Sequence, residues 1–552
     1  MNAAAPRLSA PQMWRVHAAT VLAALPWLNP FAHGPISAAV PWLTSLVVGL
    51  ALWTLALRSS ARPPWRLAWA LAPILIWAWL RQLPLQQETV FLAGGLALFL
   101  VGAAIARDDH VSRGVCSGLL LAALLTALFG LLQYFGLSAP FSPWMNAADA
   151  GEAYGNLRQP NQYASLCWLG MAVLLWGAHR LPRGVAFALA ALLAIGSAAS
   201  VSRTGMLQGL VLTVLSAAWP GPQRRFRLQL CAVAALAYFG ATLMLPFALQ
   251  AATGALPART LWGRIGGGES CSSRLVLWSN VLHLIAVKPW AGWGWGELDF
   301  AHFMTLYPGE RFCDILDNAH SLPLHLAVEL GVPAALAICL GGAWWILAQR
   351  PWKERDPRKQ LAWALLAVIL LHSLLEYPLW YGPFQLATGA ALGWLLASSE
   401  PSPAIAARRF PAAAALIVAL FVAAGYAAWD YVRISQIYLQ PAQRSARWSA
   451  DPLGHARRSF LFGKQARFAE LVLADLSREN AERMYRLSSE LLHYSPEPRV
   501  IEWLIESATM TGREQEAVLH LARYKAAFPT DYAAWRQLQG RMPPPAARNR
   551  QG

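Results

Sequence analysis

Charged residues are scarce in this sequence of 552 residues. Asp, Glu, Lys and Arg make up 13% of it, against about 25% in soluble domains, and hydrophobic residues make up 56%. The mean hydropathy is +0.37. This composition excludes disorder over most of the chain, because disordered segments have low hydrophobicity. It indicates a protein embedded in lipid.

Cysteine and the common catalytic signatures are scarce as well. Six cysteines in a chain of this length exclude a small disulfide-stabilised scaffold. The sequence has no Cys/His zinc spacing, no His-Glu-x-x-His, no Gly-x-Ser-x-Gly and no dinucleotide-binding glycine pattern. We therefore expect chemistry that uses neither a metal nor a cofactor.

Long apolar segments dominate the chain instead. A helix that spans a bilayer needs about 20 mostly apolar residues. The candidate spans are 16–33, 36–57, 65–80, 89–106, 114–137, 163–179, 184–201, 205–219, 228–250, 324–348, 361–378, 383–398 and 411–429. The first has no clear signal-peptide cleavage site, so we expect it to be retained. The sequence thus predicts an all-α polytopic membrane protein with about 13 transmembrane helices.

Basic residues concentrate in alternate connections between these spans. With the N-terminus in the cytoplasm, the cytoplasmic segments hold 19 Lys and Arg, and the short loops on the other side hold three. The three are Arg81, Arg158 and Arg203, and the 19 are Arg7, Arg15, Arg58, Arg62, Arg66, Arg107, Arg113, Arg180, Arg183, Arg224, Arg225, Arg227, Arg350, Lys353, Arg355, Arg358, Lys359, Arg408 and Arg409. This asymmetry follows the positive-inside rule. The net charge of +16 then reflects topology, which argues against nucleic-acid binding.

The spans divide the chain into four predicted regions. Residues 1–250 and 323–429 hold the transmembrane helices, residues 251–322 form a large loop outside the cytoplasm, and residues 430–552 form a domain on the same side. The last region has 18 basic and 13 acidic residues, which is typical of a soluble domain.

The C-terminal region has the pattern of paired helices. Helices are expected over 499–511 and 513–528, separated by Gly512 and followed by Pro529. Trp503 and Trp535 lie 32 residues apart, close to the period of about 34 in tetratricopeptide repeats. We therefore predict a C-terminal α-helical domain of tetratricopeptide-like character.

Two cysteines lie outside the predicted spans, Cys271 and Cys313, and both fall in the large loop. An oxidising periplasm would favour a disulfide between them. The alternative is two free thiols.

Polar side chains from separate segments are predicted at one depth, on the side away from the basic loops. Arg158, Arg203 and Arg274 have few carboxylates near them in sequence. Guanidinium groups present a fixed fork to phosphate oxygens, so such a set suits a di-anion. The alternative for each one is an arginine that reaches towards lipid headgroups.

Groups for proton transfer lie at the same depth. His320 follows Asn318 where the large loop returns to the membrane, and a neutral imidazole there can accept a proton from a hydroxyl group. A lone histidine is more often structural, and His325 shares the region. Glu376 and Tyr377 at the end of the eleventh span offer an acceptor and a phenolic donor; the alternative is an interfacial aromatic belt.

Four of these segments together resemble the bacterial O-antigen ligase superfamily, and more closely its protein-glycosylating branch, the PglL-type O-oligosaccharyltransferases. The segments are Asn156–Gln162, Ser202–Gly205, Asn318–Pro333 and His372–Tyr381. The resemblance implies an enzyme of the bacterial inner membrane with a periplasmic active site. It would transfer a glycan from undecaprenyl diphosphate to Ser or Thr of a periplasmic acceptor such as a pilin, without a metal.

The resemblance also implies roles for individual residues. His320 resembles the essential histidine of the periplasmic loop, Arg203 and Arg274 resemble the diphosphate-binding arginines, and Tyr377 resembles a tyrosine that follows the later helix. The signature of the protein-glycosylating branch contains Arg158, a further candidate for donor binding, with Gln159, Asn161 and Gln162. The candidate supporting residues are Asn161, Gln162, Asn318, His325 and Glu376.

Three alternatives to a protein acceptor remain. An O-antigen ligase would use lipid A–core as the acceptor, and an O-antigen polymerase would use another lipid-linked glycan. The Arg158–Gln162 signature and the C-terminal extension argue against the ligase. A transporter of lipid-linked glycans is disfavoured, because the sequence shows no internal repeat of broken helices.

Overall fold

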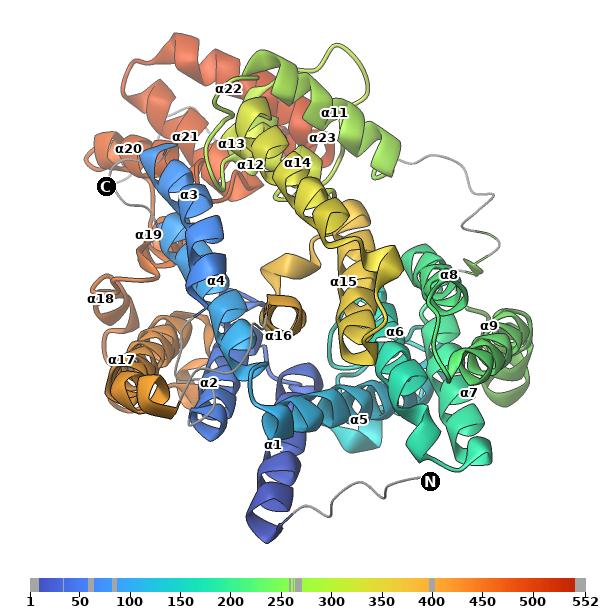
Figure 1. Ribbon diagram of the computed structural model, residues 1–552. Helices are drawn as coiled ribbons and strands as arrows, with labels where there is room; N and C mark the ends of the chain where they lie inside the picture. Colours follow the sequence, from blue (N-terminus) through green and yellow to red (C-terminus); the bar gives the residue numbers. More distant parts are fainter. Residues whose placement is uncertain are drawn as a thin grey trace. The chain divides into compact units, whose positions relative to one another are not determined.

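The computed structural model describes residues 9–32, 34–57, 64–81, 87–257, 260–261, 263, 271–396 and 403–541. Throughout these residues the regular structure is helical and no strand occurs, as predicted (Figure 1). Three arginines of the predicted cytoplasmic set, Arg7, Arg58 and Arg62, lie outside the described residues, as do parts of the predicted segments 251–322 and 399–410.

The α-helices have the following bounds: α1 Ala10–Leu28, α2 Ala39–Ala56, α3 Trp65–Arg81, α4 Gln87–Ile105, α5 Asp109–Tyr134, α6 Pro160–Gly177, α7 Arg183–Ala199, α8 Arg203–Ala218, α9 Arg224–Thr253, α11 Arg274–Val287, α12 Leu298–Met304, α13 Leu322–Leu330, α14 Val332–Gln349, α15 Pro357–Leu375, α16 Gly382–Leu396, α17 Pro403–Ser435, α18 Pro452–Ala456, α19 Gly463–Leu473, α20 Ala481–Leu491, α21 Pro498–Met510, α22 Glu514–Ala527 and α23 Pro529–Arg541.

Within the described part of the chain, seven helical segments are long and apolar enough to cross a membrane. They are Ala39–Ala56, Gln87–Ile105, Asp109–Tyr134, Arg224–Thr253, Val332–Lys353, Pro357–Leu375 and Phe410–Tyr438. The other predicted spans correspond to α1, α3, α6, α7, α8 and α16, which are shorter or less apolar. The predicted number of 13 spans therefore stays a prediction, whereas a helical chain with several apolar helices is observed.

The tenth predicted span, residues 324–348, is wrong as a single helix. The structure divides it into α13 and α14 at Gly331, whose backbone has a φ of 90°. The chain after α11 packs against this break, because Trp293 N donates to Val328 O and Val332 N donates to Pro289 O. The apolar residues on both sides of Gly331 made the segment look like one span, although Glu329 and Pro333 flank the break.

The described chain divides into two compact units. One comprises residues 1–74, 91–267 and 342–428, and the other comprises residues 75–90, 268–341 and 429–552. We call them the first and the second unit. The large loop and the C-terminal region, which lie far apart in the sequence, thus belong to one unit.

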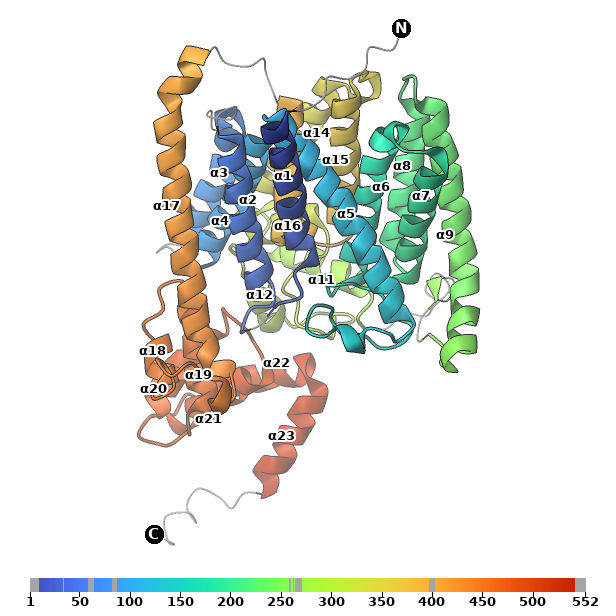
Figure 2. The ribbon, with the colours of Figure 1, turned by 90° about the horizontal axis from the view of Figure 1, so that it is seen from below.

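The first unit is a bundle of helices. α5 packs against α1, α6 and α7, and α6 packs against α7, α8 and α15 (Figure 2). Small residues permit the closest approach, as is common between membrane helices. A Cβ atom on Gly118 of α5 would lie 2.4 Å from the carbonyl oxygen of Thr20 in α1.

The second unit contains the C-terminal helices and the helices of the large loop. Each of α19 to α22 packs against the next helix in the chain, and α12 packs against α22. The expected helices 499–511 and 513–528 are observed as α21 and α22. Phe300 of α12 stacks on His493 with ring centroids 3.7 Å apart, and His493 Nδ1 lies 2.6 Å from a carboxylate oxygen of Glu297.

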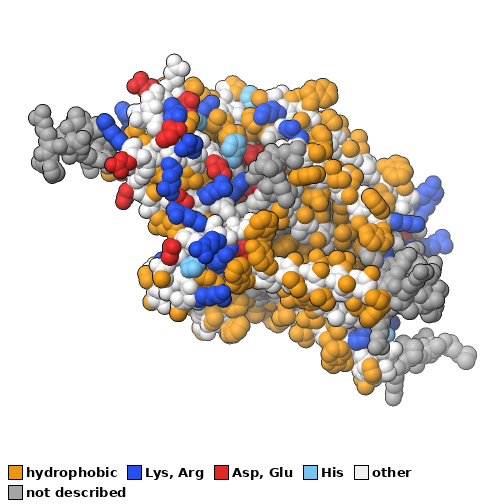
Figure 3. Space-filling model, turned by 90° about the vertical axis from the view of Figure 1, so that its left-hand side faces the viewer, with side chains coloured by type: hydrophobic (Ala, Val, Ile, Leu, Met, Phe, Trp, Pro, Cys, Tyr) orange, Lys and Arg blue, Asp and Glu red, His pale blue; other side chains and the backbone are white. Residues whose placement is uncertain are grey.

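The surface shows the two kinds of composition that the sequence predicted. In Figure 3, Asp and Glu side chains gather with many Lys and Arg in one part of the face shown, hydrophobic side chains cover much of the rest, and further Lys and Arg lie at the opposite edge. Exposed apolar residues of α17 include Leu416, Val418 and Val422. Apolar side chains on the outside of a bundle suit contact with lipid.

Candidate active site

Asn161 joins three of the predicted site segments in the first unit. Its Nδ2 donates to Glu376 Oε1 over 3.1 Å, and Ser202 Oγ donates to its Oδ1 over 2.6 Å. Asn161 lies in the first turn of α6, Ser202 precedes α8 and Glu376 follows α15. Arg203 and Tyr377 are the neighbours of Ser202 and Glu376 in sequence, so these bonds hold both of them close to the start of α6.

Side-chain caps decide where these helices begin. Gln159 caps α6, because its Oε1 accepts a bond from the backbone of Gln162 over 2.6 Å, and Pro160 occupies the first helical position. Ser202 caps α8 by accepting from Gly205 N over 3.0 Å. The exposed Arg203 is consequently the first residue of α8.

A second polar layer lies one turn further along the same helices. Ser165 Oγ lies 2.8 Å from His372 Nδ1, and Gln208 Nε2 donates to Ser165 Oγ over 2.7 Å. All three side chains are completely buried. We did not predict this cluster, although Ser165 follows Asn161 and His372 precedes Glu376 by four residues, the spacing of one helical face.

Arg158 lies on the loop before α6, and its backbone has a φ of 60°. Its Nη2 donates to the backbone oxygen of Pro30 and to Asn146 Oδ1, the latter over 3.2 Å. The side chain is exposed. No carboxylate forms an ion pair with it within the described residues.

His320 belongs to the second unit, and its backbone is held in a left-handed conformation with a φ of 49°. Such a conformation is uncommon for a residue other than glycine, and it persists only where the surroundings maintain it. The backbone N–H of His320 donates to Asn318 Oδ1 over 2.9 Å. The preceding residue, Ala319, accepts a bond from Trp278 Nε1 over 3.1 Å.

The helix α11, which begins at Arg274, contacts the turn of His320 within that unit. Trp278 follows Arg274 by four residues on α11, so the two residues share one face of the helix. The hydrogen bond from Trp278 to Ala319 places this face beside the residue that precedes His320. Ser273 caps α11 by accepting from Val276 N over 3.3 Å. Arg274, like Arg203, is therefore the first residue of a helix that follows a serine cap.

Cys271 and Cys313 form a disulfide, with Cα atoms 5.4 Å apart. The bond links the start of α11 to the segment before His320. The predicted pairing is therefore present in the structure.

His325, a predicted supporting residue, lies in the second unit. It is buried in α13, where its Nε2 lies 3.3 Å from Glu329 Oε2. Ala319 N approaches its other ring nitrogen at 3.4 Å.

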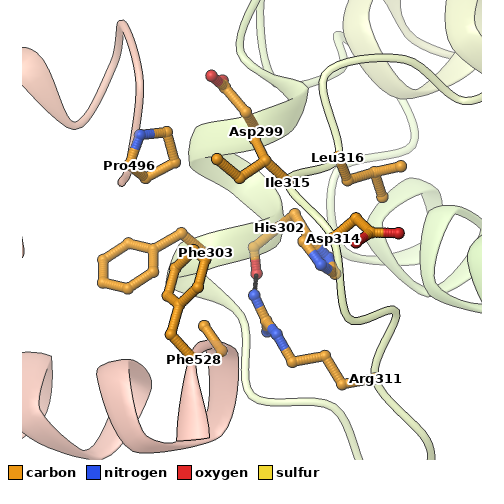
Figure 4. Close-up of a pocket in the computed structure, with 10 residues that line it drawn as sticks. Asp299, His302, Phe303, Arg311, Asp314, Ile315, Leu316, Pro496 and Phe528 are labelled. Atoms are coloured by element: carbon orange, nitrogen blue, oxygen red, sulfur yellow. Dashed lines mark hydrogen bonds between the residues drawn. The ribbon is translucent and has the colours of Figure 1, made fainter. Parts of the chain in front are cut away.

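A small pocket of about 10 Å³ lies elsewhere in the second unit, between α12 and residues near Phe528 (Figure 4). That space suits about one water. Arg311 crosses it and donates to the backbone oxygens of His302 and Thr305, each over 3.0 Å. Burial raises the pKa of Asp299, which also lines the pocket. These contacts describe a packed structural region.

The structure thus assembles two groups of predicted residues, each within its own unit. The first unit holds Arg158, Asn161, Gln162, Arg203, Glu376 and Tyr377, and the second holds Arg274, Asn318, His320 and His325. Tyr377 stacks on Tyr381 with ring centroids 6.0 Å apart.

Comparisons with known proteins match these segments in chain order. Residues 153–176 match the family described as "Protein glycosylation ligase", and residues 188–339 match "O-Antigen ligase". Residues 360–542 match "Virulence factor membrane-bound polymerase, C-terminal". A "General O-oligosaccharyltransferase" of Acinetobacter baylyi is 26% identical over 417 residues, which cover 70% of this chain and 70% of that protein.

The resemblance to the O-antigen ligase superfamily, in its protein-glycosylating branch, is confirmed. The relationship supports a glycosyltransferase with apolar membrane helices. Arg158, Asn161 and Gln162 lie within the segment that matches protein glycosylation ligases.

Proposed function

We propose that this protein transfers an oligosaccharide en bloc from undecaprenyl diphosphate to Ser or Thr hydroxyls of periplasmic proteins. The enzyme would reside in the inner membrane with its active site facing the periplasm. The observation that carries the proposal is the pair of hydrogen bonds that Asn161 makes, one donated to Glu376 and one accepted from Ser202. They bring together three motif segments that resemble this family and lie far apart in the sequence.

The arginines are proposed to bind the diphosphate leaving group. Arg203 and Arg274 each occupy the first position of a helix. A helix N-terminus favours an anion through its free N–H groups and its dipole, and a guanidinium adds a full charge. Stabilising the charge that develops on the departing diphosphate lowers the barrier. Arg158 and Tyr377 are proposed to make further contacts with the donor.

His320 is proposed as the general base. It would accept the proton of the acceptor hydroxyl while that oxygen forms a bond to the anomeric carbon and the bond from this carbon to the diphosphate oxygen breaks. The configuration at the anomeric carbon inverts. No metal takes part in this scheme. The left-handed backbone of His320 supports the proposal, because strained conformations cluster at functional sites.

The test replaces His320 in the full chain and measures glycan transfer to a pilin acceptor by mass spectrometry. His320→Ala is expected to lower transfer by about 100- to 10,000-fold, the range for loss of a general base. His320→Asn should do the same with an undisturbed turn, since asparagine tolerates a left-handed backbone. Protein level and membrane insertion should stay unchanged.

His455→Ala, in α18 of the second unit, is the matched control and should transfer glycan normally. Normal transfer by both His320 variants would remove His320 from the mechanism.

A second candidate is an O-antigen polymerase, which the match of residues 360–542 to a membrane-bound polymerase favours. The same cells distinguish the two. Glycan on Ser or Thr of the acceptor protein supports the protein transferase, whereas longer lipid-linked glycan supports the polymerase. Glycan on lipid A–core would indicate a ligase.

A further inference from the structure

A cavity of about 220 Å³ lies in the first unit beside Arg158. Besides Arg158, its walls come from Pro30–Ala32, Ser142, Pro143 and Met145–Ala147. One water needs about 10–15 Å³ of such space, so this cavity has room for a small organic ligand.

The cavity presents hydrogen-bond donors without a matching acidic group. Arg158 uses only Nη2 in its hydrogen bonds, to Pro30 and Asn146, so Nε and Nη1 have no partner among the described residues. Because a guanidinium can only donate, Asn146 faces it with Oδ1. The remaining Nδ2 of Asn146 is buried and has no partner in the described part of the chain.

Charge and donor geometry together favour a carboxylate as the occupant. Among the described residues, no Asp or Glu lines the cavity. A carboxylate accepts two parallel bonds from a guanidinium and can also accept one from an amide nitrogen.

Phe31 at the cavity, together with the adjacent Trp144, favours a sugar as the carrier of that carboxylate. Phe31 lines the cavity, and Trp144 packs edge-on against it with ring centroids 6.0 Å apart. Trp144 is 68% exposed. Its ring is apolar and rigid, and such a surface can stack on the C–H face of a pyranose.

We propose that this cavity is a subsite for one acidic sugar of the transferred glycan, with Arg158 and Asn146 binding its carboxylate. The inference rests on the proposed function, because it takes the glycan to be part of the donor. Arg158 precedes Asn161 by only three residues, so the subsite adjoins the start of α6. The enzyme would then prefer glycans with a carboxylate at this sugar.

The test uses the full-length protein in liposomes with two lipid-linked donors. The donors differ at one sugar, which carries a carboxylate in one and a hydroxymethyl group in the other, and the acceptor peptide is the same. The readout is the ratio of kcat/KM for the acidic donor to that for the neutral donor, which a uniform loss of activity does not alter. Donor binding is also measured without acceptor.

Arg158→Gln is expected to lower this ratio by about 10- to 100-fold, the value of a hydrogen bond to a charged group. Asn146→Asp should lower it too, because a second carboxylate would repel the ligand. Arg225→Gln removes an exposed arginine at the start of α9 and should leave the ratio unchanged.

An unchanged ratio in both cavity variants would overturn the proposal. The proposal would also be overturned if the fall in this ratio depended on acidic residues of the acceptor peptide, or if it depended on the content of anionic phospholipid. Arg158-dependent binding of the acidic donor without any transfer to protein would reject the proposed function and retain the subsite. Transfer from both donors with an unaffected ratio would reject the subsite alone.

Discussion

Single side chains decide where the proposed site begins. Ser202 and Ser273 cap the N-termini of α8 and α11 by accepting hydrogen bonds from backbone N–H groups, and each is followed by an arginine at the first helical position. A serine before a helical segment is a recognisable cap signal in sequence. The positions of Arg203 and Arg274 were therefore predictable, and their neighbours in space were not.

His302 in the second unit makes stability depend on pH. Burial and the charge of Arg311 lower the pKa of His302 to about 3, from a usual value of 6.5. The neutral ring is well satisfied, because Nε2–H donates to Phe312 O over 3.2 Å and Nδ1 lies 2.8 Å from the hydroxyl of Tyr307. The folded chain consequently keeps His302 neutral where the unfolded chain protonates it.

Acidification below about pH 6.5 should therefore destabilise the protein, progressively down to about pH 3. The contribution of His302 at pH 5 is about 2 kcal/mol. His302→Gln should remove this part of the loss between pH 7.5 and pH 5, as measured by thermal unfolding with tryptophan fluorescence. Asp299 acts in the opposite direction, since its pKa is raised, so only the difference between the variant and the parent isolates His302. Equal pH dependence of the two proteins would contradict this assignment.

The break between α13 and α14 shows how one element is constrained by another. Gly331 has a φ of 90° and a ψ of 157°, a combination that other residues essentially do not adopt. A Cβ atom there would lie 2.3 Å from the carbonyl oxygen of Trp290. Arg81 Nε and Trp77 Nε1 donate to Ala291 O and Leu330 O on the two sides of the contact, each over 2.9 Å.

Gly331→Ala is accordingly expected to destabilise the protein by about 1–3 kcal/mol from backbone strain alone, with more from the clash. Gly341→Ala in α14 is the matched control, because no atom lies within 4 Å of its hypothetical Cβ. A Gly-to-Ala change inside a helix stabilises by about 0.5–1 kcal/mol. Thermal unfolding of the two variants in detergent measures both effects. Equal stability of the two variants would show that the contact at Trp290 is not maintained.

Sidedness is a property of the whole molecule and can be tested directly. The positive-inside asymmetry predicts that Arg355 faces the cytoplasm and Ser449 faces the periplasm. Both residues are exposed. In a background in which the free cysteines are replaced by alanine, a membrane-impermeant maleimide added to intact cells should label the Ser449→Cys variant and not the Arg355→Cys variant. The free cysteines are Cys116, Cys167, Cys231 and Cys339.

Permeabilising the inner membrane should make the Arg355→Cys variant reactive. Labelling in the reverse order would place the candidate site in the cytoplasm. It would then contradict both the topology and a periplasmic acceptor.

The second unit was not apparent in the sequence as a unit. The large loop and the C-terminal region were expected as separate regions, yet Phe303 of α12 belongs to the same buried cluster as Trp503 and Tyr524. Arg523 Nε donates to Met304 O over 3.1 Å. Contacts between residues some 200 positions apart create this core, and no local sequence pattern predicts such contacts.

The sequence by itself determined the helical class, the apolar membrane segments, the family resemblance and the starts of the key helices. These features depend on composition, on periodicity and on caps, all of which act over a few residues. Only the tertiary structure decided that Gly331 divides the tenth predicted span and that Asn161 meets Glu376, 215 residues further along the chain. The same holds for the cavity at Arg158. Such contacts depend on how helices pack, because side chains distant in sequence become neighbours only once the bundle has formed.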